Sequence, residues 1–230
     1  DYKRAVIIGS KQTYGKGTVQ NVYDLNRWLR QNDLGDMGAL KITTQKFYRI
    51  NGGSTQLEGV KSDVVVPDRF SYIDIGEKDL DNPLPWDKIA AADYEVWDGY
   101  IDYDQTISNS NERMAKNKQL QLIEENAKWI KSKQDDSVWP LNIDAYAAKM
   151  EQNEAEAKRF DDLRNYESGL TFKSLPYEIK KFENDTVLKQ KRERWHEDLA
   201  KDVYMDEAIN VLEDLKVNNI RRGKLADVRD

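Results

Sequence analysis

The residues best suited to chemistry in this chain of 230 residues lie near its beginning, around Lys16. This lysine stands between Gly15 and Gly17, and Gln20 follows four positions later. Because glycine has no Cβ, a loop built from it can approach another backbone or a substrate closely. A lysine in such a loop can be partly desolvated, which lowers the pKa of an ammonium group and makes the amine usable as a general base. Lys16 is therefore the first candidate for catalysis.

Few other side chains offer catalytic chemistry. The chain has no cysteine, which excludes disulfides, thiolate metal ligands and cysteine nucleophiles. A single histidine, His196, argues against a structural zinc site. His196 follows Trp195 in a charged segment, so we interpret it as a surface or packing residue. We therefore expect neither a metal site nor a cofactor.

Three sequence blocks carry a family resemblance. Residues 1–9 together with Thr13-Tyr14-Gly15-Lys16-Gly17-Thr18-Val19-Gln20 resemble the region around the catalytic lysine of carboxy-terminal processing proteases, and most closely the tail-specific branch. The second block covers residues 45–56 and is followed by Gly59-Val60 and Asp63, and the third covers residues 82–89. The remainder resembles the helical C-terminal extension of that branch. Three blocks in the family's order make the resemblance specific.

This resemblance implies a serine endopeptidase with a Ser–Lys dyad, in which lysine takes the proton of the attacking serine. Lys16 matches the general base, Gln20 a glutamine that orients the lysine, and Asp1 an aspartate implicated in the tail-specific branch. In the family the nucleophile lies shortly upstream, in a stretch rich in Ser and Ala. No such stretch precedes Lys16 here, and Ser10 stands in a different context. We therefore expect a C-terminal fragment that contributes the base without the serine and is inactive alone.

Partners and location follow partly from the resemblance and partly from charge. The resemblance implies a periplasmic protein, protein substrates with apolar C-terminal tails, and a possible adaptor protein. The net charge is −6, divided into +4 over residues 1–69 and −10 over the remainder. An acidic helical half argues against nucleic-acid binding, which needs a basic surface. No apolar run is long enough to span a bilayer.

The predicted fold class is α+β, in which the strand-rich end of a protease domain precedes a mostly helical C-terminal domain. The predicted divisions are residues 1–70 for the peptidase portion, 71–111 for a connector and 112–230 for the helical domain. The change in charge near residue 70 supports the first boundary. Aromatic residues of the connector, such as Trp86 and Trp97, are interpreted as packing anchors, with a substrate-binding patch as the alternative.

Strands and turns are predicted from short apolar runs and breakers. Strands are expected at residues 5–8, 40–50 and 64–66, with a turn at Asn51-Gly52-Gly53. Residues 21–39 are expected to form a solvated loop, with a border of the substrate channel as the alternative.

Helices are predicted from apolar residues at helical spacing. They are expected at residues 112–134, from Ile143 to about residue 166 with Asn142 as the cap, from near Thr186 through Trp195, and at about 206–217. The charges after Glu151 favour a long exposed helix or a helical hairpin. A helical domain without chemistry of its own leaves a second hypothesis, in which the chain is a non-catalytic docking or scaffold module that binds a protein partner.

Overall fold

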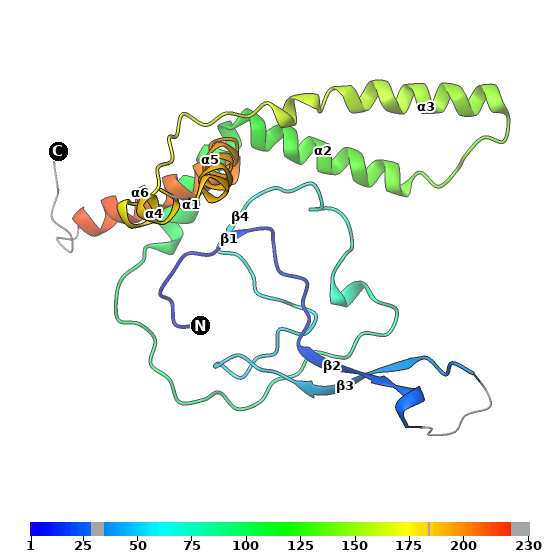
Figure 1. Ribbon diagram of the computed structural model, residues 1–230, viewed down its shortest axis with the longest axis horizontal. Helices are drawn as coiled ribbons and strands as arrows, with labels where there is room; N and C mark the ends of the chain where they lie inside the picture. The colour runs from blue at the N-terminus through cyan, green and yellow to red at the C-terminus, as the bar shows by residue number, and fades with distance from the viewer. Residues whose placement is uncertain (29–34, 184, 222–230) are drawn as a thin grey trace. The chain divides into compact units, whose positions relative to one another are not determined.

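The computed structural model describes residues 1–28, 35–183 and 185–221 and shows an α+β fold, as predicted (Figure 1). Short strands occupy the first third of the chain, and six α-helices follow within the described residues. The chain divides into two compact units. The lysine unit comprises residues 1–5, 11–62 and 74–99, and the helical unit comprises residues 6–10, 63–73 and 100–230. The boundaries proposed at residues 70 and 111 stay predictions.

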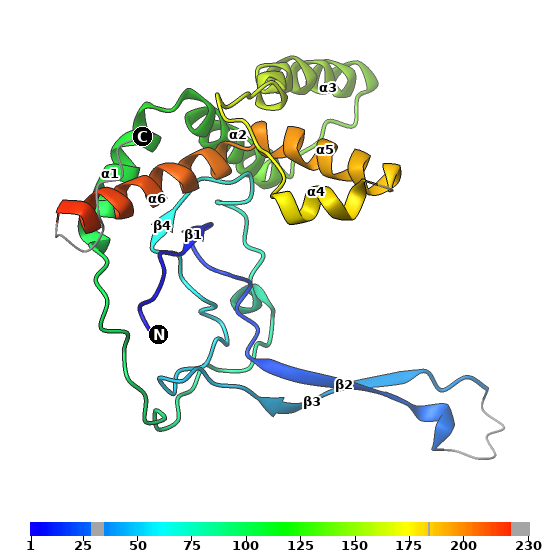
Figure 2. The ribbon, with the colours of Figure 1, turned by 60° about the vertical axis from the view of Figure 1, so that its left-hand side comes forward.

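The lysine unit contains a β-hairpin formed by β2 (Thr18–Asp24) and β3 (Ala39–Lys46) (Figure 2). The strands are antiparallel, and the extra residue Thr44 makes a β-bulge in β3 where the register shifts. The loop predicted over residues 21–39 is therefore wrong at both ends, while residues 29–34 lie outside the described residues. Because both faces of this hairpin carry exposed side chains, its sequence lacks the alternation that a half-buried strand shows.

The turn predicted at Asn51-Gly52-Gly53 is confirmed. Gly52 has a φ of +82°, and the Arg49 backbone N–H donates a hydrogen bond to the Gly53 carbonyl. A Cβ on Gly52 would lie 2.2 Å from the Ile89 carbonyl oxygen, so only glycine fits this position. The turn therefore brings residues 48–54 against residues 86–91 within the lysine unit.

The helical unit has a small apolar core beside a pair of short parallel strands, β1 (Ile8–Gly9) and β4 (Val64–Val65). The strand predicted at residues 5–8 is thus displaced toward Gly9, and the one at 64–66 is confirmed in place. The core contains the buried side chains of Val64, Val66 and Val211, with partly buried neighbours Val6, Ile8, Ile107, Met114 and Tyr204.

Helix α1 (Tyr103–Lys116) and helix α2 (Lys118–Asp135) replace the single helix predicted over residues 112–134. Asn117 separates them because its backbone is extended, with φ −82° and ψ 110°, and its side chain accepts hydrogen bonds from the backbone N–H groups of Gln119 and Leu120. An asparagine that caps the next helix offers those N–H groups a partner that a continuous helix would not. The continuous apolar spacing concealed this break.

Helix α3 (Ile143–Lys158) begins where predicted, with Asn142 as its N-cap. It ends before residue 166, and a short 3-10 turn, η3 (Asp161–Arg164), follows. Helix α3 returns along α2, and both views draw the two helices side by side (Figures 1 and 2). The ion pair from Lys133 to Glu156, at 2.8 Å, joins them. Helix α3 is thus a long exposed helix that also forms a helical hairpin with α2, so both alternatives are met.

The last helices are α4 (Pro176–Phe182), α5 (Thr186–Ala200) and α6 (Val203–Arg221). Helix α5 begins at the predicted residue, α6 begins three residues before the predicted start, and α4 was not predicted. Within the described residues, no helix combines the length and hydrophobicity that crossing a bilayer requires.

Helices α1 and α6 are joined by a network of ionic side chains. Arg113 binds Glu207 at 2.7 Å and Asp214 at 2.7 Å. Glu207 is 4% exposed and also accepts a hydrogen bond from the Ser110 hydroxyl at 2.7 Å. The hydrogen bonds to both carboxylates raise the pKa of Arg113 against the opposing effect of burial. Arg113 is thus the cation that neutralises two carboxylates between these helices.

Candidate functional site

The glycines on either side of Lys16 determine the shape of its loop. Gly15 has a φ of +90°, in the left-handed region, and a Cβ there would lie 2.8 Å from the Leu57 carbonyl oxygen. A Cβ on Gly17 would lie 2.6 Å from the Gln56 backbone nitrogen. Both distances are too short for packed atoms. The prediction that these glycines permit close backbone approach is confirmed.

Hydrogen bonds attach the backbone of the Lys16 loop to two other segments. The Leu57 N–H donates to the Gly15 carbonyl at 2.7 Å, and the Thr55 hydroxyl donates to the Lys16 carbonyl at 2.9 Å. The Phe47 N–H donates to the Gly17 carbonyl at 3.1 Å. The Lys16 side chain itself is exposed, so the loop does not shield its amine from water as the sequence analysis expected. The backbone contacts occupy the buried side of the loop and leave the side chain outside.

Gln56 holds the loop from beneath, a role that the sequence reasoning missed. Its side chain is fully buried, and its Oε1 accepts the Gly17 N–H at 2.9 Å. Its Nε2 donates to the Leu84 carbonyl at 3.0 Å and to a Glu77 carboxylate oxygen at 3.2 Å. A glutamine 39 residues away from Gly17 gives no local signal of this contact. Gln56 nevertheless satisfies groups from three segments at once.

The structure brings Lys16 and Gln20 together. The Lys16 Nζ donates a hydrogen bond to Gln20 Oε1 at 2.7 Å, and Gln20 Nε2 donates to the Thr43 hydroxyl at 3.4 Å. An amide oxygen accepts one N–H of the amine and leaves the lone pair of the neutral amine available for a proton. Because the amide is uncharged, it positions the amine without the charge by which a carboxylate would favour the ammonium form.

Asp1 is placed on a different feature, the turn that follows β3. Its carboxylate accepts two hydrogen bonds from the Arg49 guanidinium, at 2.6 and 3.0 Å, and one from the Asn51 side-chain amide at 3.1 Å. A two-point contact between a guanidinium and a carboxylate fixes the relative orientation of the two groups and also pairs their charges. The contacts of Asp1 therefore brace the turn, and none of those described here reaches Lys16.

Comparison with known proteins assigns both parts of the chain. Residues 70–217 match the family described as the C-terminal domain of tail specific protease, and residues 1–66 match peptidase family S41. This chain belongs to the tail-specific protease family. The family resemblance expected from the three sequence blocks is thereby confirmed, and the S41 match includes Lys16, Gln20 and Asp1 within its range.

Two relatives show how much of a tail-specific protease the chain represents. It is 40% identical over 167 residues to the tail-specific protease of Haemophilus influenzae, which covers 71% of this chain and 24% of that protein. It is 37% identical over 86 residues to the carboxy-terminal-processing protease of Bartonella bacilliformis, covering 35% of this chain and 18% of that protein. The chain therefore spans less than a quarter of the length of either relative.

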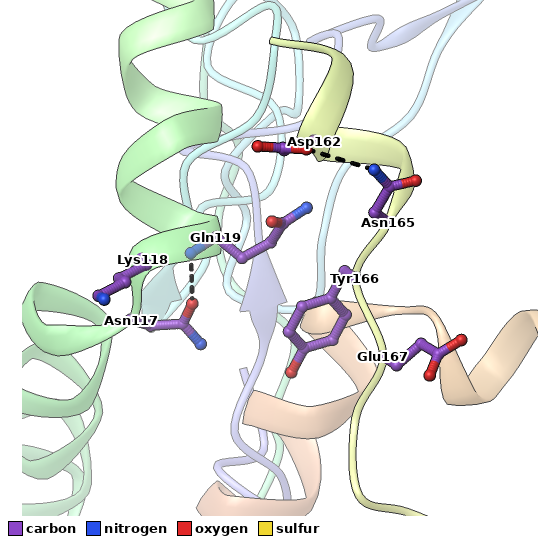
Figure 3. A pocket seen from close by; sticks show the side chains of 7 residues that line it. All are labelled: Asn117, Lys118, Gln119, Asp162, Asn165, Tyr166 and Glu167. Carbon is purple, nitrogen blue, oxygen red and sulfur yellow. Dashed lines mark hydrogen bonds between the residues drawn. The ribbon is translucent and has the colours of Figure 1, made fainter. Parts of the chain in front are cut away.

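The helical unit of this tail-specific protease chain has a shallow groove of about 480 Å³ (Figure 3). The residues that line it all carry polar or charged groups and are Asn117, Lys118, Gln119, Asp162, Asn165, Tyr166 and Glu167. Burial raises the pKa of Tyr166, and so does its hydrogen bond to Asp206 at 2.7 Å. Figure 3 marks two hydrogen bonds, in which the Gln119 backbone N–H donates to Asn117 Oδ1 and the Asn165 side-chain amide donates to Asp162 Oδ1. The Gln119 side chain also donates to the Leu163 carbonyl at 3.0 Å, which joins two segments.

Other candidate groups lie apart from Lys16 in the sequence. His196, half-buried on α5, has its Nε2 3.4 Å from the Ser174 hydroxyl, and its ring lies beside that of Trp195. In the lysine unit, the Trp86 indole N–H donates to the Ser54 carbonyl at 2.9 Å, and the interpretation of the connector aromatics as packing anchors stays a prediction. Among the described residues, no group of three or more His, Cys, Asp or Glu could hold a metal ion.

Proposed function

We propose that this chain is the C-terminal part of a serine endopeptidase and supplies its general base, Lys16. The observation that carries the proposal is the 2.7 Å hydrogen bond from Lys16 Nζ to Gln20, on a loop whose backbone is fixed by residues 47 and 55–57. A catalytic base must be held in one position, because a misplaced proton acceptor loses much of its effect. Family membership supports the same chemistry.

The proposed steps require a serine from outside this chain. Neutral Lys16 takes the proton from the serine hydroxyl as the serine oxygen attacks the scissile carbonyl, and the resulting ammonium returns a proton to the leaving amine. Gln20 keeps Nζ oriented through both transfers. Because Lys16 is exposed here, a bound substrate would supply the desolvation that its loop does not. By itself the chain should not hydrolyse peptides.

The wider biology is also part of the proposal. We infer that the substrates are proteins selected by apolar C-terminal tails, that an adaptor protein can present them, and that the protein works in the periplasm. These inferences rest on membership of the tail-specific family. For Asp1 we propose a supporting role through the turn that it braces with Arg49.

The test compares variants of the full-length protein that carries this sequence. Lys16→Ala should lower cleavage of an unfolded protein with an apolar C-terminal tail by roughly a thousandfold, because proton transfer loses its acceptor. Gln20→Ala should lower the rate less, since the amine remains. Lys11→Ala, an exposed lysine five positions away, is the matched control and should leave the rate unchanged. Full activity in Lys16→Ala, with folding intact, would exclude the dyad.

A second candidate function is a docking module, favoured by one observation. The connection between α2 and α3 and the first residue of α3 expose apolar side chains, of which Val138, Leu141 and Ile143 are 77%, 104% and 74% exposed. Exposed apolar clusters often mark contact sites for proteins. Unchanged cleavage in Lys16→Ala together with impaired cleavage in Leu141→Ser would favour this function over the catalytic one.

A further inference from the structure

Thr43 on β3 contacts the far side of the amide that meets Lys16. The Gln20 amide has an oxygen and a nitrogen, and the structure gives each of them a partner. Oε1 accepts the hydrogen bond from Lys16 Nζ at 2.7 Å, and Nε2 donates to the Thr43 hydroxyl at 3.4 Å. The second bond is long, as hydrogen bonds of catalytic groups often are before a substrate binds. Gln20 therefore links the Lys16 loop to the opposite strand of the hairpin.

The bulge in β3 determines which residue stands opposite Gln20. Val19 pairs with Gln45, but Gln20 pairs with Thr43, so the register passes over Thr44. Directly opposite residues of an antiparallel pair direct their side chains to the same face of the sheet. The bulge therefore sets the Thr43 side chain on the face of the hairpin that carries Gln20. Bulges commonly redirect side chains in this way beside active sites.

The neighbouring threonine makes a similar contact with a different residue. The Asn21 side-chain amide donates a hydrogen bond to the Thr44 hydroxyl at 3.1 Å. Gln20 and Asn21 are consecutive in β2, so their side chains point to opposite faces of the hairpin. Each threonine thus accepts one amide N–H from the other strand, but of these two contacts only that of Thr43 leads to Lys16.

The two contacts also differ in how far water reaches them. Gln20 and Thr43 are both half-buried, whereas Asn21 and Thr44 are both exposed. A hydrogen bond that is partly shielded from water is stronger electrostatically than one in full contact with it. The Gln20–Thr43 contact is therefore the better suited of the two to hold a side chain in one orientation.

The orientation of the Gln20 amide matters for a lysine that acts as a base. The amide could turn so that Nε2, and not Oε1, meets the amine. Nε2 is a donor, and beside a neutral amine it would occupy the lone pair that must receive the proton of the serine. The Thr43 hydroxyl accepts an N–H from this nitrogen and so holds it away from Lys16. The lone pair of the amine then stays available.

We propose that Thr43 is a positioning residue for the general base, acting on Lys16 through Gln20. This inference rests on the proposed function and deepens it, because it extends the chain of hydrogen bonds from Lys16 to β3. In this role Thr43 neither contacts the substrate nor transfers a proton. Loss of its hydroxyl should therefore lower kcat and leave KM nearly unchanged, since the interaction serves the chemical step and not substrate binding.

The test measures cleavage of an unfolded protein by full-length variants. Thr43→Val replaces the hydroxyl by a methyl group of similar size and should lower kcat by about fivefold, as expected for one lost hydrogen bond. Thr43→Ser keeps a hydroxyl and should stay within about twofold of the wild type. Thr44→Val is the matched control, because it removes the acceptor of Asn21, and it should also change kcat by less than about twofold. Thermal unfolding would verify that each variant folds.

A double-mutant cycle separates positioning from a general effect on the hairpin. In the Gln20→Ala protein the amide is absent, so adding Thr43→Val should lower kcat no further. A purely structural contribution of Thr43 would lower kcat by the same factor with and without Gln20. Equal losses in the two backgrounds, equal losses in Thr43→Val and Thr44→Val, or an unchanged kcat in Thr43→Val would each overturn the proposal.

The same assay distinguishes a failure of this inference from a failure of the proposed function. If Lys16→Ala abolishes cleavage while Thr43→Val behaves like its control, Lys16 remains the base and only the role of Thr43 is wrong. If Lys16→Ala retains full cleavage with its fold intact, the proposed function is wrong, and the positioning role of Thr43 is overturned with it.

Discussion

The lysine unit and the helical unit are stabilised by different kinds of contact. Within the described residues, every buried hydrophobic side chain belongs to the helical unit: Val64, Val66, Leu120, Ala127, Phe160, Val203 and Val211. The helical unit also buries the polar side chains of Thr106, Ser110 and Glu207, whereas the buried side chains of the lysine unit are all polar, namely Thr18, Ser54, Gln56 and Glu77. Apolar burial is non-directional, whereas hydrogen bonds fix distances and angles. The unit that carries the proposed base thus relies on hydrogen-bond geometry without buried hydrophobic side chains among the described residues.

This difference means that damage has different consequences in the two units. In the helical unit, a substitution can lower the free energy of unfolding without touching the Lys16 loop. In the lysine unit, the same hydrogen bonds provide stability and position Lys16, so the two properties should decline together. The following variants test this distinction, beginning with the largest expected effect.

Arg113→Met should lower the free energy of unfolding by about 4 kcal/mol, because it leaves Glu207 and Asp214 without their shared cation. Chemical denaturation would measure the loss. Lys158→Met, which removes an exposed ion pair to Glu154, is the control and should change stability by less than about 0.5 kcal/mol. A loss in Arg113→Met as small as that of the control would show that the network contributes little.

Gln56→Leu should cost about 3 kcal/mol, because a buried leucine leaves the Gly17 N–H and the Leu84 carbonyl without hydrogen bonds. The cleavage rate of the full-length protein should fall in the same variant, since the Lys16 loop loses its support. Gln45→Leu, at an exposed position on β3, is the control. If Gln56→Leu lost stability and kept full activity, stability and catalytic geometry would be separable in this unit.

Asp1→Ala should cost about 1 kcal/mol through loss of the ion pair with Arg49, which is partly exposed. A double-mutant cycle with Arg49→Ala would measure the coupling, and the double variant should be little worse than either single one. If Asp1→Ala lost cleavage and showed no coupling energy with Arg49, Asp1 would instead act on catalysis directly and not through the turn.

Acid should weaken the α2–α3 hairpin through Glu156. The ion pair with Lys133, with further hydrogen bonds from Trp129 and Gln152, lowers the pKa of Glu156 from about 4.5 to about 2. A carboxylate with a depressed folded-state pKa stabilises fully above the unfolded value, and this stabilisation is lost as the pH falls through the folded one. Thermal unfolding between pH 4.5 and 2 should therefore vary less in Glu156→Gln than in the wild type. Identical pH profiles would contradict this assignment.

Local signals in the sequence predicted the features that depend on neighbouring residues. Asn142 as a helix cap and Asn51-Gly52-Gly53 as a turn are such cases, since each is decided within a few residues. Helix α4 escaped prediction because it has only seven residues. Strand β3 was predicted, because residues 40–50 were expected to form a strand. Strand β2 escaped because exposure on both faces removes the alternation by which strands are recognised.

The candidate site shows the same division. Lys16 and Gln20 were predicted from the family resemblance, and their four-residue spacing allows the contact that the structure shows. Gln56 could not be predicted, because its contacts to Gly17, Glu77 and Leu84 join segments that only the fold brings together. Gln56 ends the second sequence block, and the residues around it gave no reason to assign it a role of its own.

Gly15 and Gly17 fit tightly against residues 56–57, whereas Lys16 between them does not. The three residues of this short motif are therefore constrained for two different reasons. The glycines are required by backbone clearance, so they should be retained in any relative that folds this way. The lysine between them is exposed and is not required for that clearance. A gene copy that had lost catalysis could therefore keep both glycines and vary only at the middle position. In genome surveys, the flanking glycines would report the fold, and the lysine alone would report the proposed general base.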